Sequence, residues 1–189
     1  PNIKKLAGKR IPLSDVKLDG YNAFIGADVY MPSGEIKQHD LLFRDDELVA
    51  IDDFCESKIK GLVNYVLLKG KMIAPAIFDE HIHGGFGVSF HNSTEAEIRK
   101  LLKQFNNEGI GGVLATMLPD SVENIKNQIK ILNNIIKNPD KNATKIFGIH
   151  LEGPFLNPQK AGIHPRDILK LPTIETYEKF EPENVKMVT

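Results

Sequence analysis

The chain has 189 residues, of which 41% are hydrophobic and 26% charged, the balance of a soluble globular protein with a buried core. Its formal net charge is −1 and no dense block of Lys and Arg stands out, which argues against nucleic acid or an anionic membrane as a partner. The longest apolar stretches, 62–68 and 110–118, fall well short of the roughly 20 residues that span a bilayer. No apolar signal-peptide core follows the N-terminal lysines, and the single cysteine, Cys55, cannot form an internal disulfide, so we expect a cytoplasmic protein.

Residues 1–74 are predicted to form a β-rich first part. Short segments of strand-forming residues alternate with turn residues such as Pro32-Ser33-Gly34 and Asp45-Asp46. The expected strands cover residues 23–30, 36–44, 48–54 and 63–69.

The pattern changes near Met72, from where strands and amphipathic helices alternate. Apolar residues at helical spacing predict a helix over 94–108, with Thr94 and Glu97 as a capping box and Gly109 as a stop signal. Ser121 is the expected cap of a second helix. The expected strands are 73–78, 110–117, 145–151 and 185–188, with a further helix over 173–180.

Alternating strands and helices indicate parallel β/α units. A complete eightfold β/α barrel takes about 250 residues, whereas residues 75–189 number only 115. We therefore expect an α/β chain that holds the first strands of an incomplete barrel, as the front part of a larger enzyme.

Two motifs after predicted strands carry the chemistry: Asp79-Glu80-His81-Ile82-His83-Gly84 and His150-Leu151-Glu152-Gly153-Pro154. Side chains alternate along a strand, so His81 and His83 share one face, and His150 shares a face with Glu152. The carboxyl edge of parallel barrel strands is where catalytic groups collect. Two imidazoles and a carboxylate that converge there would form part of a metal site.

The first motif, preceded by Ala74-Pro75-Ala76, looks like the Pro-Gly-x-x-Asp-x-His-x-His-Gly signature of the amidohydrolase superfamily, with Ala76 in place of the usual glycine. The run His-Leu-Glu-Gly-Pro-Phe-Leu-Asn at 150–157, followed by Lys-Ala-Gly-Ile-His-Pro at 160–165, resembles the N-acetylglucosamine-6-phosphate deacetylases in particular. This resemblance implies a TIM-like barrel beside a small β-sandwich. Residues 1–74 would belong to the sandwich and 75–189 to the first part of the barrel.

The resemblance also implies an activity: metal-dependent hydrolysis of N-acetylglucosamine 6-phosphate to glucosamine 6-phosphate and acetate. It implies that Glu152 binds the metal, that Ile163 contacts the phosphorylated sugar and that His164 lies at the rim of the pocket. His81 and His83 are expected metal ligands that permit a second ion. The expected cofactor is Zn²⁺ or another first-row divalent ion, one or two per subunit, and the expected assembly is a homodimer.

No residue of this chain matches the family's catalytic aspartate or its two further histidine ligands, which are expected beyond Thr189. We therefore expect the 189-residue chain alone to be inactive and to self-associate through uncovered strands and helix faces. Two alternatives stay open. Amidohydrolases that act on cyclic amides share the first motif, and a fragment could bind or assemble without catalysing a reaction.

Other polar and flexible positions near the motifs have plainer interpretations. His150 is expected to be a packed, hydrogen-bonded core residue, and His91 and Asn92 are expected in turn or cap roles. The run Gly84-Gly85-Phe86-Gly87 lacks the Lys-Ser/Thr pair of a phosphate-binding P-loop, so it predicts a tight turn beside the metal site.

Overall fold

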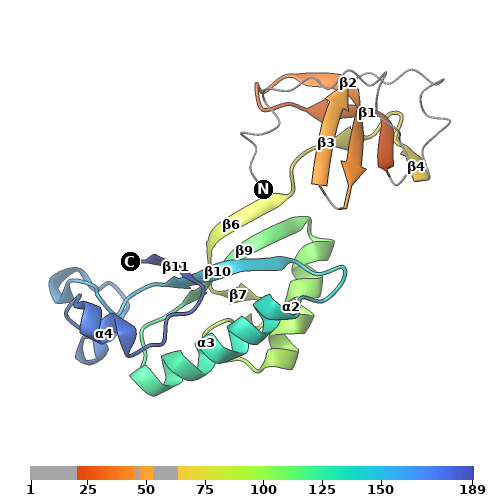
Figure 1. Cartoon of the computed structure of the whole chain (residues 1–189). Helices are drawn as coiled ribbons and strands as arrows, with labels where there is room; N and C mark the ends of the chain where they lie inside the picture. Colours follow the sequence, from red (N-terminus) through yellow and green to blue (C-terminus); the bar gives the residue numbers. More distant parts are fainter. Residues whose placement is uncertain (1–20, 46, 53–63) are drawn as a thin grey trace. The chain divides into compact units, whose positions relative to one another are not determined.

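The computed structural model describes residues 21–45, 47–52 and 64–189. The chain divides into two compact units, Pro1–Pro75 and Ala76–Thr189. The described strands of the first unit form one sheet, and the second unit alternates strands with helices (Figure 1). Cys55 lies outside the described residues. Among the described residues, no helix is long and apolar enough to cross a bilayer.

The first unit is built on a mixed sheet in the order β3-β2-β1-β4, with β5 also paired to β1. β1 is antiparallel to β2 and parallel to β4 and β5, and β2 is antiparallel to β3. Ala27, Val29 and Leu41 form its small buried core. The strands are β1 (Asn22–Tyr30), β2 (Ile36–Arg44), β3 (Glu47–Asp52), β4 (Asn64–Leu67) and β5 (Met72–Ile73).

The single strand predicted over 73–78 is wrong, because two strands share this stretch. β5 ends at Ile73 and pairs with β1, whereas β6 (Ile77–Ile82) belongs to the sheet of the second unit. The sequence Ala74-Pro75-Ala76 separates the two strands. Proline has no amide hydrogen to donate to a strand ladder, so Pro75 is a natural break. β6 extends further than expected and includes His81.

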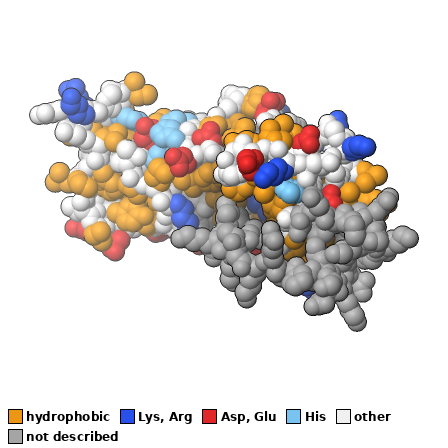
Figure 2. All heavy atoms as spheres, turned by 90° about the horizontal axis from the view of Figure 1, so that it is seen from above, with side chains coloured by type: hydrophobic (Ala, Val, Ile, Leu, Met, Phe, Trp, Pro, Cys, Tyr) orange, Lys and Arg blue, Asp and Glu red, His pale blue; other side chains and the backbone are white. Residues whose placement is uncertain are grey.

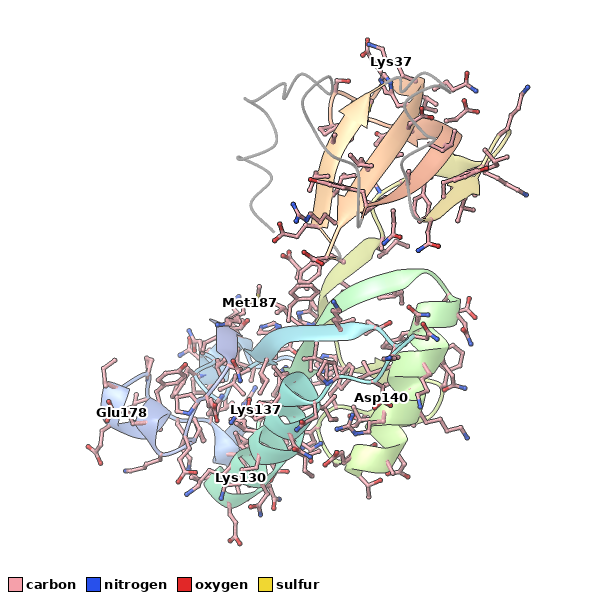
Figure 3. All side chains as sticks on the ribbon, turned by 45° about the vertical axis from the view of Figure 1, so that its right-hand side comes forward. Lys37, Lys130, Lys137, Asp140, Glu178 and Met187 are labelled. Atoms are coloured by element: carbon pink, nitrogen blue, oxygen red, sulfur yellow. The ribbon has the colours of Figure 1, made fainter. Side chains whose placement is uncertain are left out.

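The sheet of the second unit confirms the expected α/β class with parallel strands. Its order is β11-β10-β9-β6, and every neighbouring pair is parallel. Met187 marks β11, which lies beside β10 (Figure 3). β9 (Ile110–Met117), β10 (Lys145–Leu151) and β11 (Val185–Val188) have the predicted bounds. A short hairpin of β7 (Gly84–Gly85) and β8 (Val88–Ser89) follows β6.

Two amphipathic helices cover one face of this sheet: α2 (Glu95–Asn107) and α3 (Val122–Lys137) (Figure 1). Thr94 and Glu97 form the predicted capping box, and the Ser121 hydroxyl caps α3 by accepting from the Asn124 amide. Their buried apolar stripes meet the strands in one core. That core contains Ile98, Leu101, Leu102, Phe105, Val113, Ala115, Met117, Ile125, Ile129, Leu132, Ile149 and Leu151.

A longer connection links β10 to β11. It contains the 3-10 turns Pro158–Lys160 and Arg166–Ile168 and the short helix α4 (Ile174–Glu178), which Thr173 caps. The helix predicted over 173–180 is therefore present but shorter. Phe180 follows α4 and is fully buried, which anchors the connection to the core.

Candidate metal centre

Three potential metal ligands meet at the carboxyl edge of the parallel sheet. His81 lies near the end of β6, His83 directly follows that strand, and Glu152 directly follows β10. His83 Nε2 lies 2.9 Å from Glu152 Oε2, and His81 Nε2 lies 3.8 Å from the same oxygen. One ligand atom from each residue lies within 4.8 Å of the others. Figure 2 shows several histidine side chains gathered on the surface beside acidic side chains.

This donor set fits a divalent metal ion. Two imidazole nitrogens and a carboxylate oxygen suit Zn²⁺ and other first-row ions. The side chains of His81 and His83 are 49% and 39% exposed, whereas Glu152 is 22% exposed. The centre can therefore be reached from solvent, while its carboxylate is largely enclosed by the protein.

The backbone around the ligands is held from several sides. The Glu152 amide donates to the Met117 carbonyl at 3.0 Å, which ties the glutamate to the end of β9. The His81 amide donates to Asp79 Oδ1 at 3.0 Å, and the His83 carbonyl accepts from the Phe90 amide at 2.8 Å. Both sides of the cluster therefore start from fixed backbone positions.

The hairpin after His83 is the predicted tight turn. Phe86 and Gly87 have φ values of 51° and 79°, in the left-handed region that a narrow hairpin turn requires. Gly84 has φ 140°, and a Cβ atom built there would lie 2.1 Å from the Val88 carbonyl oxygen. Only glycine lets the chain fold back this closely beside the histidine pair.

His164 comes to the centre from the connection between β10 and β11. Its Nε2 lies 3.7 Å from Glu152 Oε1, and its side chain is only 11% exposed. The structure thus brings His164 next to Glu152, on the side of its second carboxylate oxygen. Ile163, the expected sugar contact, is 91% exposed to solvent.

His150 is a buried structural residue, as the sequence predicts. It is 1% exposed, its Nδ1 lies 3.3 Å from Thr116 Oγ1, and its Nε2 lies 2.8 Å from Thr189 Oγ1. Burial lowers the pKa of His150 below its ordinary value, and charge on His81 lowers it further. The ring is therefore neutral near pH 7.

His91 has a partner that the sequence does not reveal. Its Nε2 lies 3.1 Å from Asp120 Oδ2, so the contact links the segment after β8 to the segment after β9. Burial alone would raise the pKa of Asp120, but hydrogen bonds from the Ser121 amide and the Asn124 side chain, together with His91, bring it below its ordinary value. Asp120 is therefore ionised near pH 7.

Comparison with known proteins identifies sequence relatives of this chain. No family model matches the chain. N-acetylglucosamine-6-phosphate deacetylase from Bacillus subtilis is 28% identical over 62% of this chain and 31% of its own length. N-acetylgalactosamine-6-phosphate deacetylase from Escherichia coli O157:H7 is 26% identical over 72% of this chain and 34% of its own length. The chain thus spans about a third of the length of these curated relatives.

The fold has a counterpart among solved structures. The crystal structure of N-acetylglucosamine-6-phosphate deacetylase from Pasteurella multocida superposes with a TM-score of 0.72 at 20% identity, over 89% of this chain and 44% of that one. At this identity the match shows the fold alone. The sequence relatives carry the family likeness independently, at 26–28% identity. The resemblance read from the two motifs is confirmed: over most of its length, the chain is similar to part of the N-acetylglucosamine-6-phosphate deacetylases.

Proposed function

We propose that the intact enzyme containing this chain hydrolyses the acetamide of N-acetylglucosamine 6-phosphate to glucosamine 6-phosphate and acetate, using a divalent metal ion. The observation that carries the proposal is the convergence of His81, His83 and Glu152, with ligand atoms within 4.8 Å of one another. The names of the sequence relatives support the substrate class.

The fold assignment belongs to the same proposal. The parallel strands β6, β9, β10 and β11 would be the first strands of a TIM-like barrel, and residues 1–74 would belong to a small β-sandwich. The similarity in fold to the Pasteurella multocida enzyme supports this arrangement. We propose a homodimer as the working assembly, as the sequence resemblance implies.

The chain's own residues would divide the work at this centre. Glu152 would hold the ion with its carboxylate, and His81 and His83 would offer imidazole nitrogens. When bound, a divalent ion supplies polarisation of a carbonyl and a lower pKa for water. His164 lies close enough to Glu152 to contact an acetamide at the centre. Ile163, exposed to solvent, would meet the sugar.

The activity test is release of acetate from N-acetylglucosamine 6-phosphate by the purified intact enzyme. N-acetylgalactosamine 6-phosphate is the matched second substrate, since one relative bears that name, and dihydrouracil represents the cyclic amides. We expect the glucosamine derivative to be hydrolysed and dihydrouracil to be left intact. Preferential hydrolysis of dihydrouracil would contradict the proposed substrate class.

A substitution at the centre tests the role of the carboxylate. Glu152→Gln removes the charge but keeps the size of the side chain, so the protein should fold while metal content and turnover fall. A neutral amide is a much weaker ligand than a carboxylate for these ions. Near-normal turnover and metal content in Glu152→Gln would show that Glu152 is no metal ligand.

A further inference from the structure

The strand β6, which contains His81 and ends just before His83, is irregular at the point where it approaches the metal centre. In the pairing of β6 with β9, Asp79 lies opposite Val113 and Ile82 lies opposite Ala115, so β6 uses one residue more than β9. Such a bulge interrupts the ladder of backbone hydrogen bonds and redirects the side chains next to it. His81 lies inside the interruption, and Ile82 separates the two histidines.

A side chain of β9 completes the interrupted ladder. The Ile82 amide donates to Thr116 Oγ1 at 3.0 Å, in place of a backbone carbonyl. Thr116 is fully buried, so no water reaches this hydroxyl. A partly buried amide still needs an acceptor, and Thr116 supplies it between His81 and His83.

The Thr116 hydroxyl is also the first member of a row of hydrogen-bonding groups next to the metal centre. Thr116 Oγ1 donates to the Leu114 carbonyl at 3.3 Å and also lies 3.3 Å from His150 Nδ1. His150 Nε2 in turn lies 2.8 Å from Thr189 Oγ1, within hydrogen-bond distance. The row crosses from β6 through β9 and β10 to the residue after β11. The His150 ring also packs edge-on against His81, with 5.0 Å between ring centroids.

We propose that Thr116 is a positioning residue of the metal centre, whose hydroxyl fixes the His81–His83 segment and orients His150 beneath it. The inference rests on the proposed metal site and adds a residue that neither motif contains. Groups behind metal ligands set their orientation, and removing them typically weakens metal binding by about 10- to 100-fold.

A pair of substitutions separates the hydroxyl from the shape of the side chain. Thr116→Val keeps the branched shape but removes the acceptor, whereas Thr116→Ser keeps the hydroxyl. Thr144→Val, at the residue directly before β10, is the matched control. Thr144 is also buried, and its hydroxyl donates to the Ile110 carbonyl at the opposite end of β9.

Zinc titration of the metal-free intact enzyme by calorimetry gives the first readout. We expect Thr116→Val to weaken zinc binding by at least about tenfold, with Thr116→Ser and Thr144→Val close to the unaltered enzyme. If Thr116→Val and Thr144→Val weaken zinc binding equally, Thr116 contributes only to the general stability of the fold, and the inference is overturned. Unchanged zinc affinity in Thr116→Val would also overturn it.

Hydrogen exchange at the Ile82 amide gives a second readout that needs no metal. Exchange should accelerate in Thr116→Val and stay slow in Thr116→Ser and Thr144→Val. If the unaltered intact enzyme binds no zinc, the proposed metal site fails, and this exchange comparison alone decides whether Thr116 fixes the segment. Equal protection of Ile82 in all variants would refute the inference.

Discussion

Gly84 offers a sharp test of how the hairpin shapes the metal centre. Its φ of 140° is a conformation that residues with side chains rarely adopt, and forcing one there costs about 1–3 kcal/mol. A Cβ atom would also lie 2.1 Å from the Val88 carbonyl oxygen and 2.9 Å from Ser89 Cα. Both contacts involve backbone, so the hairpin itself must shift, at a further cost of about 1–3 kcal/mol.

We therefore expect Gly84→Ala to lower the free energy of unfolding of the second unit by about 2–6 kcal/mol, the sum of these two costs. The control is Gly87→Ala in the same hairpin. Gly87 also has a positive φ, 79°, but its Cβ would meet nothing within 4 Å, so only a backbone cost of about 1–2 kcal/mol applies.

Urea unfolding followed by the helical circular dichroism signal measures the difference, because the helices of the described residues lie in the second unit. Zinc affinity should fall in Gly84→Ala as well, since the shifted hairpin begins at the residue after His83. Equal midpoints for Gly84→Ala and Gly87→Ala would show that the close approach at Gly84 does not constrain the fold.

Three further predictions concern the core, the Asp120 carboxylate and the two histidine ligands. Leu132→Ala in α3 removes a fully buried side chain and should lower the free energy of unfolding by about 2–5 kcal/mol. The control Lys130→Ala, on the outer side of the same helix (Figure 3), should change it by less than about 0.5 kcal/mol. Equal costs for the two substitutions would contradict the packing of α3. The pKa of Asp120 is lowered in the folded state from its ordinary value of 3.8, so the carboxylate contributes stability that is present above about pH 4 and lost as the pH falls through the folded pKa. Asp120→Asn should flatten the stability profile in that acid range, and an unchanged profile would show that the ionised carboxylate does not stabilise the fold. The double change His81→Asn and His83→Asn should reduce the metal bound per chain in elemental analysis, and unchanged metal content would remove the pair from the site.

Much of the second unit follows from the sequence because its signals are local. β9 and β10 are apolar runs of strand length, and α2 and α3 have apolar stripes with Thr94 and Ser121 as caps. Such features act within one helix or strand, so tertiary packing seldom changes the secondary structure that they predict. The meeting of His81 with Glu152 also follows from one rule, the shared carboxyl edge of parallel strands.

The parts that the sequence does not predict depend on partners far along the chain. The division of 73–78 between β5 and β6 is decided by which sheet each half joins. The role of Thr116 depends on the hydrogen bond that its hydroxyl accepts from the Ile82 amide beside the bulge of β6. The role of Asp120 depends on its contact with His91. The available signal for Thr116 was its hydroxyl near the carboxyl end of an otherwise apolar strand.

The most direct measurement for the metal centre is an anomalous difference map from crystals, grown with zinc, of the intact enzyme that contains this chain. We expect one peak between His81, His83 and Glu152, with zinc-to-nitrogen distances of about 2.0–2.1 Å. A peak at other residues, or a clear map with no peak at these three, would contradict the metal centre proposed for this chain.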